Sequence, residues 1–180
     1  MWPWAAITAP LLFALLVEAD PCALPQIACA ARLSAYPPAE EPVNDASGWE
    51  ASGLEDVPVY DEFFLPISPF DFTAVANVSE HEICECGSDA SNCSFIDPDH
   101  VIRLDAMVEL TFCRRTEEIF KNPCRGRRGV IRVIGRIHES GEALTSVDES
   151  VMFCKCERGY QRIRVEPWMN DLYAFIYKCV

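Results

Sequence analysis

The spacing of the cysteines is the feature that most constrains how this chain can fold. Eight of its ten cysteines lie in the last hundred residues, as two Cys-x-Cys pairs and four single residues: Cys84, Cys86, Cys93, Cys113, Cys124, Cys154, Cys156 and Cys179. In an oxidising compartment, an even number of cysteines in a short chain indicates a disulfide framework. We expect each Cys-x-Cys pair to bond to two different neighbours, but eight cysteines allow about 105 pairings, so the connectivity stays open. The other two, Cys22 and Cys29, are expected to form a small separate bridge.

The first residues indicate that compartment. Residues 5–17 form an apolar stretch, and the small side chain of Ala19 follows it at a suitable distance for signal peptidase. The stretch is shorter than the roughly 20 apolar residues that a membrane span needs. We therefore expect a signal peptide over residues 1–19, cleavage after Ala19, and a secreted, extracellular protein with no membrane span.

Charge divides the remaining chain in two. Residues 1–105 contain 18 acidic and 2 basic side chains, whereas residues 106–180 contain 10 and 13, so the net charge of −13 belongs to the N-terminal part. Most of the prolines lie there too. We expect an acidic, proline-rich arm over residues 20–80 and a disulfide-rich module over residues 81–180. A net-acidic secreted protein argues against nucleic acid as a partner.

The disulfide-rich module is predicted to consist of strands. From Val101 to Cys113 every even position is apolar and most odd positions are polar, which is the period of a half-buried strand. Turn signals such as Glu166-Pro167 separate further strands, expected over residues 130–137, 150–156, 160–165 and 172–179. The fold class is therefore all-β: a small disulfide-rich module of antiparallel strands and hairpins behind an acidic, proline-rich extended segment. The aromatic residues near its end are expected to lie in the core: Trp168, Tyr173, Phe175 and Tyr177.

The first candidate binding segment lies in the acidic arm, around Tyr60, Phe63 and Phe64. Aromatic side chains between carboxylates on a proline-stiffened chain suit docking onto a basic, partly apolar groove, because such a chain loses little entropy on binding. The acidic surroundings of Tyr60 also make it a candidate for sulfation. The alternative is that these aromatics pack on the cysteine module as a strap, because exposed clusters of this kind favour aggregation.

The second candidate is a basic loop that contains Arg125, Arg127 and Arg128. Three interpretations stay open: an exposed hairpin that balances the acidic arm, an electrostatic patch for heparan sulfate or an acidic receptor, and a convertase cleavage site after Arg128. Cleavage there would leave the halves joined if disulfides span it.

One glycosylation site is expected. Asn77-Val78-Ser79 matches the acceptor pattern at the border of the two parts, where surface exposure is expected. Asn92-Cys93-Ser94 matches formally, but a bonded cysteine at its centre makes it a poor acceptor.

No motif indicates catalysis, a metal or a cofactor. The three histidines (His81, His100 and His138) lack ligand spacing, and the chain has no Gly-x-Ser-x-Gly, His-Glu-x-x-His or phosphate-binding glycine loop. The sequence therefore predicts a protein that is not an enzyme and acts by binding.

The order of the cysteines resembles that of small secreted modules from arthropods. A Cys-x-Cys, single cysteines after strands (Leu110-Thr-Phe-Cys113), Phe153-Cys-Lys-Cys156 and a closing Tyr177-Lys-Cys179 are similar to giant-lens (Argos-type) EGF antagonists and to scoloptoxin-like secreted proteins. The resemblance covers residues 81–180 and implies an extracellular β module that binds a protein ligand or receptor as an antagonist or modulator. The alternative function is a venom or salivary effector that acts on a host channel or protease, with the Arg128 loop as a substrate mimic.

Overall fold

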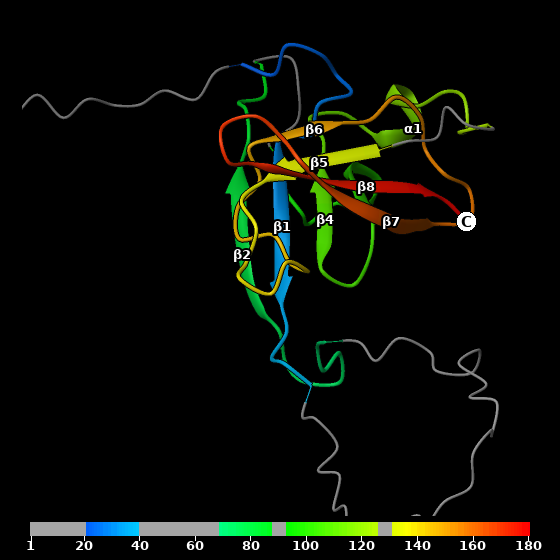
Figure 1. Ribbon diagram of the computed structural model, residues 1–180. Coiled ribbons are helices and arrows are strands. Elements are labelled where there is room, and N and C mark those ends of the chain that lie inside the picture. Colours follow the sequence, from blue (N-terminus) through cyan, green and yellow to red (C-terminus); the bar gives the residue numbers. More distant parts are fainter. Residues whose placement is uncertain (1–20, 40–68, 88–92, 126–130) are drawn as a thin grey trace, which may run out of the picture.

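The computed structural model describes residues 21–39, 69–87, 93–125 and 131–180. They form two four-stranded antiparallel sheets that lie against each other, with their strands crossing (Figure 1). The predicted all-β class is confirmed. The helical segments of this part are single turns, η2 (Pro98–His100) and α1 (Thr116–Ile119). None of the described helices is long and apolar enough to cross a membrane.

The first sheet has the strand order β2-β1-β4-β3. Its strands are β1 (Ala30–Ala35), β2 (Asn77–Glu82), β3 (Val101–Arg103) and β4 (Val108–Thr111). Arg32 lies opposite Glu80 on one side and Glu109 on the other, and it forms ion pairs with both at 2.8 and 3.4 Å. A charged row therefore marks the outer face of this sheet.

The second sheet has the order β6-β5-β8-β7. Its strands are β5 (Ile131–Gly135), β6 (Glu149–Val151), β7 (Tyr160–Pro167) and β8 (Tyr173–Cys179). One hydrophobic core joins the two sheets, and it combines Leu33, Leu110 and Phe112 from the first part of the chain with Val133, Phe175 and Tyr177 from the second. Phe175 and Tyr177 thus lie in the core, as their strand spacing predicted, whereas Tyr173 is only half-buried and Trp168, expected in the core, is exposed.

The segment from Val101 to Cys113 is a hairpin rather than the single long strand that its alternation suggests. Val101 lies opposite Thr111 and Ile102 opposite Leu110, and the turn between them is closed by Asp105. One carboxylate oxygen of Asp105 accepts hydrogen bonds from the backbone N–H groups of Met107 (2.8 Å) and Val108 (2.9 Å). An aspartate that binds the backbone two and three residues ahead is a standard turn former.

All ten cysteines are bonded, and the two members of each Cys-x-Cys pair bond to different partners, as predicted. The bridges are Cys22–Cys84, Cys29–Cys93, Cys86–Cys113, Cys124–Cys154 and Cys156–Cys179. The expected bridge between Cys22 and Cys29 is wrong. Both residues instead bond to cysteines on the other side of the acidic stretch, because β1 and β2 pair antiparallel and bring residues near 29 next to residues near 84.

The fold begins well before residue 81. β1, from the segment expected to be an arm, lies between β2 and β4 in the centre of the first sheet, and β2 itself runs across the expected border at 80/81. Ala31 and Leu33 of β1 are buried in the core. The expected signal peptide (residues 1–19) and the aromatic positions Tyr60, Phe63 and Phe64 lie outside the described residues.

Candidate protein-binding surface

Besides the cysteines, the structure describes two of the predicted site residues, one for glycosylation and one for binding. Asn77 is exposed at the start of β2, and Arg125 is exposed shortly after α1. Arg127 and Arg128 lie outside the described residues. Arg125 lines a surface hollow together with Asn122, Pro123, Phe153 and Cys154, with a volume of about 490 Å³.

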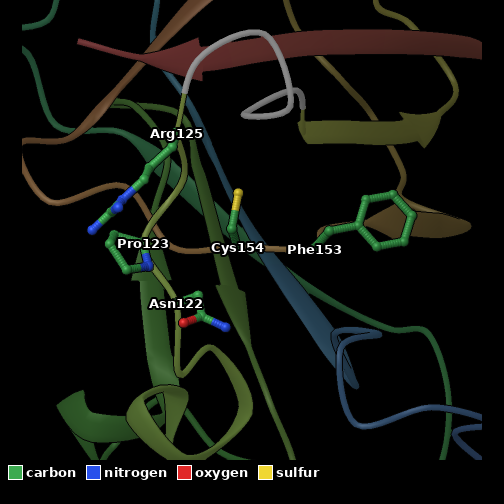
Figure 2. Close-up of a pocket in the computed structure, with 5 residues that line it drawn as sticks. All are labelled: Asn122, Pro123, Arg125, Phe153 and Cys154. Carbon is green, nitrogen blue, oxygen red and sulfur yellow. The ribbon is translucent and has the colours of Figure 1, made fainter.

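Phe153 connects this hollow to a second one of about 410 Å³. The second hollow lies between the segment before β1 and the outer edge of β6, and its lining is largely apolar: Leu24, Gln26, Ile27, Glu149, Ser150, Val151, Met152 and Phe153. Figure 2 shows that the side chains of Arg125 and Phe153 extend to opposite sides of Cys154. We call the two hollows together the Phe153 surface.

Phe153 lines both hollows, and its side chain is largely exposed. Its exposed fraction is 73%, and that of Leu24, across the apolar hollow, is 57%. Its neighbour Met152 is buried, and the alternation of a strand-like segment turns the next side chain outward. A preformed hollow lined by apolar side chains is a candidate binding site.

Covalent and hydrogen bonds hold the walls of the Phe153 surface in place. Cys154 is bonded to Cys124, and the N–H of Cys124 donates to the carbonyl oxygen of Lys155 at 3.0 Å. On the apolar side, the backbone N–H of Ala28 donates to the Oγ of the buried Ser150 at 3.1 Å. The hollow is therefore formed before any partner arrives, which reduces the entropy that binding loses.

Among the described residues, Arg125 is the charged residue of the first hollow. Arg125 is exposed where it lines the first hollow, and it forms no ion pair with another residue of the described ranges. The strongest pKa shift among the described residues lies elsewhere, at Tyr177 in the core. Burial, followed by the charge of Asp105 and its hydrogen bond, raises the pKa of Tyr177 well above its ordinary value. That phenol is a structural group.

Two clusters of sulfur atoms have the spacing of metal ligands. Cys29, Cys86 and Cys113 form one, and Cys124, Cys156 and Cys179 form the other, with the sulfurs of each within 4.8 Å of one another. Every one of these sulfurs is in a disulfide. Metals bind cysteine as the thiolate, which a cystine does not offer. The clusters are therefore points where disulfides pack together: Cys29–Cys93 with Cys86–Cys113 in the first, and Cys124–Cys154 with Cys156–Cys179 in the second.

Sequence reasoning did not single out Phe153 as a site residue. The alternation of residues 150–156 contained a signal, because an inward Met152 implies an outward Phe153. The opposite wall could not be predicted, since Leu24 is brought there by long-range pairing and by the bridge Cys22–Cys84.

The fold and this surface define a small disulfide-rich protein of two β-sheets with a preformed surface hollow. No protein-family model and no curated protein matches the chain. Among solved structures, it matches the crystal structure of unliganded Argos with a TM-score of 0.44 and 15% sequence identity, over 89% of this chain and 57% of that one. This resemblance to Argos is weak, and this chain spans little more than half of the Argos chain.

Proposed function

We propose that this chain is a secreted, non-enzymatic protein that binds an extracellular protein ligand or receptor through the Phe153 surface. The observation that carries the proposal is the exposure of Phe153 at the junction of an apolar and a basic hollow. The five disulfides support an extracellular location, because such frameworks persist in oxidising compartments.

The chemistry of the two hollows indicates what they would recognise. The apolar hollow between Leu24 and Phe153 suits a large apolar side chain, and Arg125 suits a carboxylate, with which guanidinium forms paired hydrogen bonds. We therefore expect a segment of the partner in which an apolar residue and an acidic residue lie close together. Aromatic and arginine side chains at the centre of an interface contribute most of its binding energy.

The test is affinity capture from extracellular fluid and cell-surface extract with the secreted chain as bait, in three versions: wild type, Phe153→Ala and Ile96→Ala. Ile96 is the matched control, because it is 91% exposed and lines neither hollow. A partner is expected with wild type and Ile96→Ala. With Phe153→Ala its affinity should fall about 30-fold, which corresponds to about 2 kcal/mol for a truncated central residue.

The same variant separates binding from folding. Complete burial of a phenylalanine side chain contributes about 1.5–3 kcal/mol, and Phe153 buries only a small part of its surface. Phe153→Ala should therefore lower the free energy of unfolding by less than about 1 kcal/mol. A partner that binds Phe153→Ala and wild type equally well would contradict the proposed site.

A further inference from the structure

β2 is the terminal strand of the first sheet, and no strand in the described part of the chain pairs with its outer side. Five of its six residues are exposed. An open edge presents unpaired backbone N–H and C=O groups on which another chain can form a strand, so proteins protect their edges with prolines, bulges, charges or short strands.

The other terminal strands are protected by a bulge, a proline or a short length, whereas β2 is protected only by the charges of Glu80 and Glu82. β7 has a bulge between Arg162 and Arg164 and ends at Pro167, and β3 and β6 are three residues long. β2 contains neither a proline nor a bulge over its six paired residues. Its alternating charges Glu80 and Glu82 lie toward one end, which leaves the end at Asn77 and Val78 uncharged.

Exposed apolar side chains gather at this uncharged end. Val78, on β2, is 53% exposed, and Val75, just before it, is 94% exposed. Phe72 is also exposed, although its ring contacts the ring of Tyr36 edge-on with centroids 4.9 Å apart. An edge strand whose end carries exposed apolar side chains and no charged residue of its own favours strand pairing between copies of a chain.

Asn77 is the first residue of this strand, and it begins the acceptor sequence Asn77-Val78-Ser79. Asn77 and Ser79 are both exposed, and the side chain of Asn77 makes no hydrogen bond to another described residue that a glycan would break. We propose that an N-linked glycan on Asn77 covers the open edge of β2 and keeps the chain monomeric.

The modification requires only the ordinary secretory machinery. The side-chain amide nitrogen of Asn77 bonds to the first sugar carbon of a lipid-diphosphate oligosaccharide, loses a proton, and displaces the lipid diphosphate. Paired strands lie about 4.8 Å apart, so a second strand would need the space directly beside β2. A bulky, hydrated oligosaccharide attached to the first residue of β2 obstructs that space from the face on which Asn77 lies; the next side chain, Val78, lies on the opposite face.

The test uses the full chain secreted from cells that glycosylate. Asn77→Gln and Ser79→Ala each remove the acceptor sequence by a different route, and Ser79→Thr keeps it as the matched control. Wild type and Ser79→Thr should lose mass on enzymatic deglycosylation and elute as monomers in size exclusion with light scattering. Asn77→Gln and Ser79→Ala should carry no glycan at residue 77 and should form dimers or larger assemblies as concentration rises.

A second substitution tests whether the edge causes the association. Val78→Lys added to Asn77→Gln places a charge on the bare edge and should restore the monomer, since edge lysines oppose strand pairing. Absence of a glycan from wild-type Asn77 would overturn the proposal. Monomeric Asn77→Gln and Ser79→Ala would overturn it too, and failure of Val78→Lys to restore the monomer would show that the glycan acts elsewhere. None of these outcomes depends on the Phe153 surface.

Discussion

One of the hydrogen bonds between the two sheets lies where its contribution to stability can be measured. The hydroxyl of Tyr177, fully buried on β8 of the second sheet, donates to Asp105 Oδ2 at 2.9 Å. The other oxygen of Asp105 closes the β3–β4 turn of the first sheet through Met107 and Val108. One carboxylate therefore holds both the turn and the opposing strand.

Tyr177→Phe removes the connection and keeps the ring. A hydrogen bond to a charged group contributes about 1.5–3 kcal/mol. Asp105 is only partly buried and retains its two backbone donors, so water can replace part of the loss. We expect the free energy of unfolding to fall by about 1–2 kcal/mol. For a chain of this size, the midpoint of thermal unfolding should then fall by roughly 2–8 °C.

The dependence of the free energy of unfolding on alkaline pH gives a second, independent measurement of this hydrogen bond. Burial and Asp105 raise the pKa of Tyr177 well above 10, so the folded chain keeps a proton that the unfolded chain releases near pH 10. The contribution of Tyr177 to stability is therefore complete below about pH 10 and falls by up to about 1.4 kcal/mol per pH unit above it. Tyr177→Phe lacks this dependence, so its deficit relative to wild type should shrink between pH 9 and 11.

The assay is urea unfolding with intact disulfides, followed by intrinsic fluorescence at several pH values. Tyr173→Phe is the control, because Tyr173 lies on the same strand and its hydroxyl makes no hydrogen bond to another described residue. It should change stability by less than about 0.5 kcal/mol. The reasoning would be refuted if Tyr177→Phe matched this control at pH 7, or if it kept the alkaline slope of wild type.

Two further predictions concern the backbone and the disulfides. Gly135→Ala would place a Cβ 1.9 Å from the backbone oxygen of Ser146, so the backbone must move; we expect a loss of more than about 3 kcal/mol and reduced secretion. Gly141→Ala, at φ +76° with open space around it, should cost only about 1–2 kcal/mol; equal urea midpoints for the two variants would contradict the packing argument. Two disulfides close loops that overlap over most of their length: Cys22–Cys84 spans 62 residues and Cys29–Cys93 spans 64. When either bridge is removed, the other still restrains the unfolded state over nearly the same segment. Alanine replacement of both pairs should therefore destabilise the chain, in urea unfolding, by more than the sum of the two single replacements, and simple additivity would refute this.

Local pattern predicted the buried face of residues 101–113 but not their hairpin. Ile102 and Leu110 are both even positions and lie opposite each other, so folding the segment at Asp105 leaves the even positions on the core side. Alternation is therefore the same for one long strand and for this hairpin.

The turn expected at Glu166-Pro167 lies elsewhere, because Pro167 is the last residue of β7. A terminal strand tolerates proline because its outer N–H needs no partner. The reversal comes later, at Asn170 and Asp171, which both have positive φ.

The candidate site depended on contacts that no local pattern contains. The outward position of Phe153 could be predicted from its neighbours, but the hollow also needs Leu24, more than a hundred residues away. Composition suggested that everything before residue 80 was one acidic arm. The short apolar run of β1 (AARLSA) is too small to change that average, and its central place in the sheet follows only from the pairing of distant strands.

The position of β1 also changes how the acidic stretch should be understood. The N–H of Ala39 donates to the carbonyl oxygen of Pro69 at 3.0 Å, and the N–H of Asp71 donates to that of Pro37 at 2.9 Å. The two described segments that flank residues 40–68 are therefore paired with each other, so in the order of the chain these residues are an insertion between β1 and β2 and not a tail before the domain. Deletion of residues 1–80 would remove β1, the strand between β2 and β4, and would leave Cys84 and Cys93 without partners. The contribution of the Tyr60 segment can thus be separated from that of the Phe153 surface only by an internal deletion that keeps both flanks paired.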